Sequence, residues 1–310
     1  MRIYILSRNE ELYSTRRLVE EANAKGWEVR VIDYLKCTIE IMKNELVINY
    51  EGKILPTPDA IIPRIGASRT FYGTAMVRHF EMMDVFSTSG NLAIARSRDK
   101  LRSLQVLSKN GVDMPKTIFA SNKSNAKDVI ALSGGAPLVL KILEGTQGVG
   151  VVLVDSEKAA KSVLDAFYGM EVNLLVQEFI EEAGGADIRA LVVNDEVVGA
   201  MKRQGAEGDF RSNLHQGGSA TAYKLSRKEK ATALAAAKAM GLGVCGVDMI
   251  PSKRGPLVME VNSSPGLEGI EKSTNINIAA KIMDFIEKSV KPKCPINPQK
   301  RKLKKDKIGA

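Results

Sequence analysis

The stretch that decides the fold is Leu257-Val258-Met259-Glu260-Val261-Asn262-Ser263-Ser264-Pro265-Gly266, an apolar strand pattern that stops at a Pro-Gly turn signal. Side chains alternate between the two faces of a strand, so Glu260 and Asn262 point the same way while Val261 points into a core. The stretch therefore predicts a half-buried strand that carries a carboxylate and a carboxamide on one face.

A second strand is predicted upstream at residues 244–250, with the sequence Val-Cys-Gly-Val-Asp-Met-Ile. Residues 251–256 between the two runs contain two prolines and a glycine, which are typical of a turn. A hairpin centred on Arg254 places Asp248 opposite Glu260. Two carboxylates and the neutral amide oxygen suit a hard cation such as Mg²⁺. A solvent-facing polar stripe is the alternative, and this hairpin taken alone favours it.

A glycine-rich loop, Glu144-Gly145-Thr146-Gln147-Gly148-Val149-Gly150, joins two apolar runs at residues 137–143 and 151–154. Such flanks predict a loop between two strands, whereas Rossmann and P-loop nucleotide sites need a glycine loop that opens a helix. Those sites are therefore disfavoured. A glycine-rich hairpin tip can close its backbone N–H groups over phosphates, with Lys141 as a point charge beneath it. An ordinary flexible loop is the alternative from the loop alone.

A second hairpin is predicted at residues 187–203, because two β-branched runs flank the turn signal Asn194-Asp195. The two-residue period of a strand places Asp187 and Arg189 on one face, with Arg203 on the returning strand. A long glycine-rich loop follows the hairpin. A long loop inside an otherwise regular domain is more often functional than not.

This ordered set of motifs resembles the ATP-grasp ligase superfamily. The residues that carry the resemblance are Lys141, the glycine flap at 145–150, Gln177-Glu178-Phe179-Ile180, Asp187, Arg189, Arg211-Ser212-Asn213, Asp248 and residues 260–266. More narrowly, residues 63–66, 96–102 and 266–272 resemble the RimK type. The similarity runs from Met1 to about residue 290 and is therefore specific.

The resemblance implies an α/β fold of the ATP-grasp kind, in which a Rossmann-like pre-ATP-grasp domain precedes two subdomains that hold ATP between antiparallel sheets. The implied parts are the N-terminal domain at 1–95, a central subdomain with the glycine-rich flap at 96–180, a C-terminal subdomain with the metal site at 181–290, and a basic tail at 291–310. Alternating strand and helix patterns before residue 95 independently predict a small α/β domain.

The resemblance also implies an ADP-forming ligase that joins an acid to an amino acid. RimK-type enzymes add L-glutamate to the C-terminus of a small-subunit ribosomal protein. Members of the superfamily phosphorylate a carboxylate with ATP, and an amine then attacks the acyl phosphate with loss of phosphate. Catalysis of this kind rests on positioning and on neutralising charge at the moving phosphoryl group.

Residues that match the family's motifs receive their roles from the resemblance. Asp248, Glu260 and Asn262 are expected to hold two Mg²⁺ or Mn²⁺ ions. The expected ATP contacts are Lys100, Lys141, Gly145, Gly148, Gly150, Glu178, Phe179, Asp187, Arg211, Ser212 and Asn213. Arg189, Arg203 and Arg211 are the candidates for neutralising an acyl phosphate or a substrate carboxylate, and a plain ion pair is the alternative for each. Asp248→Asn is expected to leave the fold intact, because adjacent metal carboxylates repel one another.

Composition and charge limit the partners. The chain has 310 residues, a formal net charge of +9 and three widely separated cysteines that form no metal or disulfide pattern. No apolar run approaches a membrane span of about 18 residues, so a reducing cytoplasm and no membrane contact are expected. Residues 291–310 supply +7 of the charge, which leaves the body close to neutral. This tail is expected to be disordered, and either contacts ribosome or RNA or has no partner.

Three functions are consistent with the sequence. The leading one is an ATP-dependent L-glutamate ligase that acts on a protein C-terminus. The second is an ATP-grasp ligase with a small-molecule acceptor, and the third is a nucleotide-switched protein that binds ribosome or RNA. The complete set of expected metal ligands argues against a switch, since a switch that need not turn over can lose a ligand. A homo-oligomer is also expected.

Overall fold

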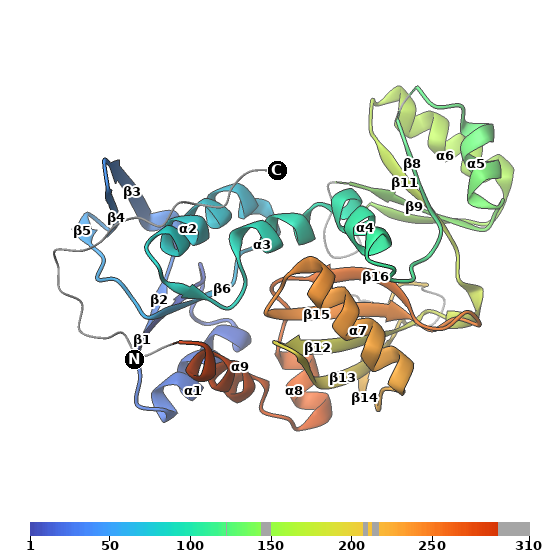
Figure 1. The fold of residues 1–310 in the computed structure, drawn as a ribbon. Helices are drawn as coiled ribbons and strands as arrows, with labels where there is room; N and C mark the ends of the chain where they lie inside the picture. The colour runs from blue at the N-terminus through green and yellow to red at the C-terminus, as the bar shows by residue number, and fades with distance from the viewer. Residues whose placement is uncertain (122, 144–149, 207–209, 213–216, 291–310) are drawn as a thin grey trace. The chain divides into compact units, whose positions relative to one another are not determined.

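The computed structural model describes residues 1–121, 123–143, 150–206, 210–212 and 217–290. Contacts divide the chain into two compact units, one made of residues 1–94 with the segment that begins at Ala279, and the other of residues 95–278. Helices and both parallel and antiparallel sheets are present, so the α/β class is confirmed (Figure 1). Within the described residues, every helix is too short or too polar to pass through a lipid bilayer.

The first unit contains a four-stranded parallel sheet of the Rossmann kind. Its strand order is β2-β1-β6-β7, and every neighbouring pair is parallel. The strands are β1 (Arg2–Leu6), β2 (Glu28–Ile32), β6 (Ala60–Pro63) and β7 (Phe86–Ser87), and the helices are α1 (Tyr13–Ala24) and α2 (Thr70–Met82). Ile3, Tyr4, Ile5 and Leu6 of β1 are fully buried, as expected for an inner strand of a parallel sheet.

Helix α9 (Ile278–Ser289) packs on this first unit, whereas the sequence analysis assigned residues 279–290 to the C-terminal subdomain. Phe285 packs edge to face against Phe86 of β7, with ring centroids 5.6 Å apart. Lys25, just after α1, forms ion pairs with Asp284 at 2.9 Å and Glu287 at 2.7 Å. The periodicity of an amphipathic helix shows which face is buried but not which body buries it, and this explains the difference.

A small antiparallel sheet interrupts the first unit between β2 and β6, and the sequence analysis did not predict it. Its strands are β3 (Cys37–Met42), β4 (Glu45–Tyr50) and β5 (Lys53–Ile54), in the order β3-β4-β5. The hydroxyl of Tyr72 on α2 donates to the carbonyl of Cys37 at 2.5 Å, which ties the sheet to the helix.

The second unit begins with α3 (Asn91–Arg98), which crosses the boundary between the units, and α4 (Lys100–Lys109). Its first sheet has the order β10-β9-β11-β8 and is antiparallel. The strands are β8 (Thr117–Ala120), β9 (Leu138–Ile142), β10 (Val151–Val154) and β11 (Leu174–Glu178), and the helices are α5 (Ala126–Ser133) and α6 (Glu157–Gly169). Strands β9 and β10 pair directly across residues 143–150, so the predicted strand-to-strand connection is confirmed.

The core of this first sheet is formed by alternate residues of its strands. Leu138 and Leu140 of β9 and Val176 of β11 pack with α5 and α6 in one apolar cluster. Lys141 alternates with these residues along β9, so its side chain leaves the sheet on the face opposite the helices.

The second sheet of this unit has the order β14-β13-β12-β15-β16, again antiparallel. The strands are β12 (Ala186–Val193), β13 (Glu196–Gln204), β14 (Ser219–Ala222), β15 (Val244–Ile250) and β16 (Leu257–Asn262). Helix α7 (Arg227–Met240) begins with the capping box of Ser226 and Glu229, and α8 (Glu268–Thr274) follows β16. Both hairpins predicted from the sequence are therefore present.

The β15–β16 hairpin keeps the predicted register around the site. Gly246 pairs with Asn262, Val247 with Val261, and Asp248 with Glu260. The register then shifts by one residue, because Met249 pairs with Val258 and leaves Met259 as an extra residue in β16. Such a β-bulge bends the strand next to the Asp248–Glu260 pair.

Gly150 at the base of the flap generates a stability prediction. Its φ is +74°, and a Cβ atom there would lie 2.2 Å from both Cγ1 and Cδ1 of Ile142. Gly150→Ala should therefore lower the free energy of unfolding by about 1–3 kcal/mol, measured by urea denaturation. Gly111→Ala is the matched control, since Gly111 has φ +70° but no atom within 4 Å of the added Cβ. Equal losses in both variants would show that the contact with Ile142 costs nothing.

Candidate active site

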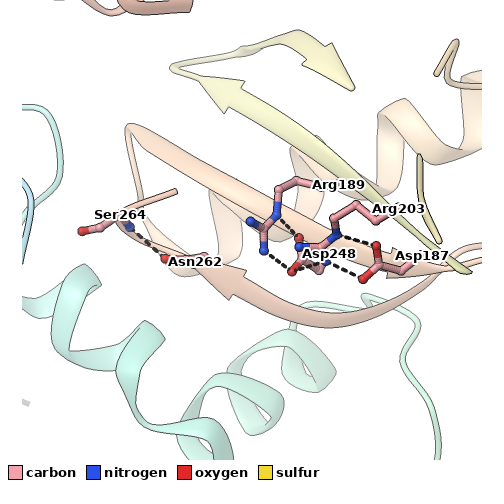
Figure 2. Close-up of polar contacts among 6 residues, drawn as sticks. All are labelled: Asp187, Arg189, Arg203, Asp248, Asn262 and Ser264. Carbon is pink, nitrogen blue, oxygen red and sulfur yellow. Dashed lines mark hydrogen bonds and ion pairs between the residues drawn. The ribbon is translucent and has the colours of Figure 1, made fainter. Parts of the chain in front are cut away.

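Three neighbouring strands bring four charged side chains together on the second sheet. In the strand register, Asp187 of β12 faces Arg203 of β13, and Arg189 of β12 faces Asp248 of β15. Residues two apart on a strand share a face, so Asp187 and Arg189 project together from β12. Figure 2 shows the four side chains in one row, with Asp248 between the two arginines.

The four side chains form a continuous chain of ion pairs. Arg189 holds Asp248 with two bonds, from Nε to Oδ1 at 2.6 Å and from Nη2 to Oδ2 at 2.5 Å. Arg203 bonds Oδ2 of Asp248 through Nη2 at 2.9 Å and binds both oxygens of Asp187, from Nε at 2.7 Å and also from Nη2. The carboxylates are 3 % exposed and the Arg203 side chain is 9 % exposed, so the chain is almost wholly buried.

Burial and the two arginines shift the pKa of Asp248 in opposite directions. Burial opposes ionisation, but the charges and hydrogen bonds of Arg189 and Arg203 outweigh it and lower the pKa of Asp248 well below its usual range. Burial also disfavours the charged form of Arg203, yet Asp248 and Asp187 raise its pKa further above its usual value. Burial raises the pKa of Asp187, against the hydrogen bond and charge of Arg203, so the pKa values of the two carboxylates shift in opposite directions.

Glu260 has a different environment from its partner Asp248. Its side chain is reachable by solvent, but the protein around it and the neighbouring charge of Asp248 raise the pKa of its carboxyl, against the opposing charges of Arg189 and Lys141. Asn262 is half-buried, and its Oδ1 accepts a hydrogen bond from the backbone N–H of Ser264 at 3.0 Å. The three expected cation ligands thus lie on one face of the β15–β16 hairpin.

Two lysines come close enough to Glu260 to interact with it electrostatically. Lys141 donates to Oε1 of Gln177 at 2.6 Å, and burial lowers its pKa to about 8 although Glu260 opposes the shift. Lys100 at the start of α4 donates to the carbonyls of Ile142 at 3.1 Å and Leu143 at 2.8 Å, and burial lowers its pKa as well. Two cations therefore face a carboxylate beside the flap, which is an arrangement suited to a polyphosphate.

The expected adenine-binding strand and nucleotide loop also meet. Phe179 after β11 packs edge to face against Phe210, with ring centroids 6.4 Å apart. The guanidinium of Arg211 lies 5.9 Å from the centroid of the Phe210 ring, and the hydroxyl of Ser212 bonds Asp187. Residues 210–212 are thereby placed beside Phe179.

Several expected contacts take protein partners instead of facing outward. Glu178 accepts from the backbone of Lys116 at 2.6 Å and also pairs with Arg254. Asp187 is buried and takes Arg203 on both oxygens, so its expected ribose contact needs a rearrangement. Arg203 is likewise buried between two carboxylates, which makes it a residue that positions Asp248 rather than one that touches substrate.

The remaining expectations fall at the edge of the described chain. Gly145, Gly148 and Asn213 lie outside the described residues, and Gly150 forms the base of the flap. The sequence analysis assigned no role to Gln177, which holds Lys141 and in turn donates to Thr117 at 2.8 Å. The available signal was a lone carboxamide in an otherwise apolar strand, since a buried polar side chain requires partners.

The donor set fits a divalent cation that brings ligands of its own. No group of three or more His, Cys, Asp or Glu side chains able to hold a metal occurs among the described residues. Asp248 and Glu260 are nevertheless directly opposite each other, and burial together with the charge of Asp248 raises the pKa of Glu260. Two carboxylates and one amide suit Mg²⁺ that completes its shell with phosphate oxygens and water.

A Rossmann-like unit followed by two antiparallel sheets, with Lys141 on one and opposed carboxylates on the other, defines an ATP-grasp ligase. Residues 97–286 match the family model of the RimK-like ATP-grasp domain, and residues 1–94 match that of the RimK pre-ATP-grasp domain. The chain belongs to the RimK-like ATP-grasp family, and it is an ADP-forming ligase.

Similar proteins support the assignment along almost the whole chain. A probable alpha-L-glutamate ligase of Saccharophagus degradans is 61% identical over 292 residues, which cover 94% of this chain and 97% of that protein. A probable alpha-L-glutamate ligase of Vibrio vulnificus is 62% identical over 292 residues, with the same coverage.

Solved structures show the same fold at low sequence identity. The ATP-grasp ligase PsnB complexed with minimal precursor has a TM-score of 0.73 at 19% identity, covering 94% of this chain and 98% of PsnB. The D-alanine–D-alanine ligase of Bacillus anthracis complexed with ATP has a TM-score of 0.67 at 19% identity, covering 94% and 97%. ATP-grasp ligases as a class use ATP and Mg²⁺, and PsnB has also been solved with Mg and ADP.

The two opposed carboxylates should respond differently to neutralisation. Asp248→Asn removes the charged partner of the buried Arg203 and the half-buried Arg189 and should lower the free energy of unfolding by about 3 kcal/mol at pH 7, contrary to the expectation of an intact fold. A lowered pKa gives Asp248 a stabilising effect above its ordinary pKa that is lost as pH falls, whereas a raised pKa means that ionisation of Glu260 lowers the stability of the folded state.

Glu260→Gln should therefore keep or increase stability in the same urea denaturation assay. Both variants should lose ligase activity, so activity does not separate them and stability does. A Glu260→Gln protein that is as unstable as Asp248→Asn would contradict the opposite pKa shifts.

The pKa of Lys141 predicts a pH-dependent affinity for nucleotide. Because its pKa is lowered to about 8, Lys141 is cationic below that pH and neutral above it. The affinity for Mg²⁺–ADP, measured by calorimetry, should fall as the pH rises from about 7 to 9, since only the cation attracts phosphate. Lys141→Arg keeps its charge throughout and should give a flatter profile. The same fall in both proteins would assign the titration to another group.

Proposed function

We propose that this protein is an ATP-dependent L-glutamate ligase that adds glutamate to the C-terminus of a small-subunit ribosomal protein and releases ADP and phosphate. The observation that carries the proposal is the convergence of Lys100 and Lys141 on Glu260, directly opposite Asp248. Relatives about 60% identical bear the name probable alpha-L-glutamate ligase, which supports L-glutamate as the amino acid that is added.

The reaction requires a carboxylate to be converted into an electrophile. The acceptor's terminal carboxylate attacks the γ-phosphorus of ATP and ADP leaves, giving an acyl phosphate. The amine of L-glutamate then attacks the acyl carbon, the new C–N bond forms, and phosphate leaves with the former carboxylate oxygen. Catalysis depends on holding the reactants in line and on neutralising the charge of the phosphoryl group.

The residues take roles that follow from their positions. Lys100 and Lys141 neutralise the phosphates of the nucleotide beside the flap, with Gln177 orienting Lys141. Phe179 lines the adenine side, and Arg211 and Ser212 approach the nucleotide from the adjoining loop.

Asp248, Glu260 and Asn262 would hold two Mg²⁺ or Mn²⁺ ions, which would polarise the phosphate oxygens and fix their geometry. Arg203 and Asp187 keep the carboxylate of Asp248 in place for this ligand set.

A peptide acceptor is supported by the structural likeness to PsnB, which has been solved with precursor peptide. The basic residues 291–310 lie outside the described structure, and their proposed part is to attract the chain to the ribosome or RNA in the cytoplasm. The alternative within the same class is a small-molecule acceptor, and the likeness to a D-alanine–D-alanine ligase is the observation that favours it.

The test is an acceptor assay with a blocked control. The protein is incubated with Mg²⁺, ATP and L-glutamate and with a peptide of the ribosomal protein's C-terminus, as the free acid or as the C-terminal amide. Whole glutamyl mass increments on the free acid alone, with equal release of ADP and phosphate, are expected. Phosphate release without a mass increment would reject this acceptor in favour of a small molecule, and absence of ATP turnover would reject the ligase reaction.

A further inference from the structure

The contact with Asp248 uses only part of the hydrogen-bonding capacity of the Arg189 guanidinium. Its Nε and Nη2 donate to the two oxygens of Asp248, and among the residues that the structure describes its Nη1 donates to none. The side chain is 14 % exposed, more than the 9 % of Arg203, so it is the arginine of the pair that solvent and ligands can reach. Arg189 is therefore suited to exchange partners, whereas Arg203 is locked between two carboxylates.

Asp248 has little capacity left for a further partner. A carboxylate offers about four lone-pair sites, and Asp248 accepts three N–H bonds, two from Arg189 and one from Arg203. A divalent cation ligated by Asp248 must take the same oxygens that Arg189 holds. Asp248 already holds two guanidinium groups, and each of them would repel a third cationic group on the same buried carboxylate.

The net charge around Asp248 and Glu260 determines when a divalent cation can displace Arg189 from Asp248. Around the Asp248–Glu260 pair lie four cationic side chains, Lys100, Lys141, Arg189 and Arg203, against three carboxylates, Asp187, Asp248 and Glu260. A free divalent cation thus meets a centre of positive net charge. A cation that arrives with the polyphosphate of a nucleotide meets a centre whose lysines are already neutralised.

We propose that Arg189 and a divalent cation compete for the carboxylate of Asp248, so that the cation of the incoming nucleotide releases Arg189 to bind an oxyanion of the substrates. The proposal rests on the proposed function for its substrates, but the competition itself requires only the cation. It makes Arg189 the link between cation binding and substrate binding, because the guanidinium reaches the substrate only after the cation has taken its partner.

A glycine lies beneath the side chain of Arg189. Gly246 faces Asn262 in the hairpin, and a Cβ atom on it would lie 3.1 Å from Cβ of Pro265 and 3.6 Å from Cδ and Nε of Arg189. The side chain of Arg189 therefore passes close to Gly246, whose other near neighbour is Pro265. The oxyanion is either a carboxylate of L-glutamate or the acyl phosphate, and both suit the paired donors of a guanidinium.

The competition is tested by titrating Mn²⁺ alone into the wild type and Arg189→Leu, with free Mn²⁺ measured by electron paramagnetic resonance. Removing the competitor should tighten Mn²⁺ binding about tenfold or more. Arg189→Lys keeps a charge but lacks the two-pronged grip on Asp248, so it should fall between them. Arg17→Leu is the control, since Arg17 pairs with Glu20 at 2.5 Å and Glu21 at 2.8 Å in the first unit and should leave Mn²⁺ binding unchanged.

Steady-state kinetics at saturating Mn²⁺–ATP tests whether the released Arg189 binds an oxyanion of the substrates. A KM for L-glutamate raised about tenfold in Arg189→Leu would assign the released guanidinium to the amino-acid carboxylate, and a lowered kcat with unchanged KM would assign it to the acyl phosphate. If folded Arg189→Leu and Arg189→Lys bind Mn²⁺ with the affinity of the wild type, the proposed competition is wrong, whichever substrates the enzyme joins. Failure of the wild type to use L-glutamate would instead reject the proposed function and leave the Mn²⁺ result standing.

Discussion

The interaction on which the site depends is the buried row of ion pairs Asp187, Arg203, Asp248 and Arg189. Each member is useful only because its neighbours compensate its charge, since a lone buried ion is costly and a paired one is tolerable. The row runs across β12, β13 and β15, so it also fixes which residues of these strands face one another. Any slip of one residue would place the four side chains on opposite faces and bury them without partners.

The first sheet of the second unit provides a polar face for the buried charge of Lys141. Its strands devote alternate residues to the apolar cluster with α5 and α6, which leaves the intervening residues for a polar face. Lys141 and Gln177 occupy that face and bind each other. Burial disfavours the charged form of Lys141, so an anion bound at this face would stabilise that charged form. One strand thus supplies both the core and the charge.

The sequence predicts well what depends on short range. The β15–β16 hairpin and its register at Asp248 and Glu260 follow from local patterns. The partnership of Arg189 with Asp248 did not follow, because it depends on β12 lying beside β15, 59 positions apart in the chain. The bulge at Met259 was missed for a similar reason, since a strict two-residue period assumes that neither strand carries an extra residue. The place of α9 required knowledge of which surface remains to be covered.

A hydrogen bond at the outer edge of β16 joins this strand to the segment that follows α4. The N–H of Val258 donates to the carbonyl of Asp113 at 2.8 Å, in the segment that leads from α4 to the first sheet, and Arg254 reaches Glu178 at the end of that sheet. These attachments fasten the first sheet to the strand that carries Glu260, two residues beyond Val258. The strand that carries Glu260 is therefore also a point of attachment for the first sheet of the second unit. A change in either contact would alter the connection between Lys141 on one sheet and Glu260 on the other.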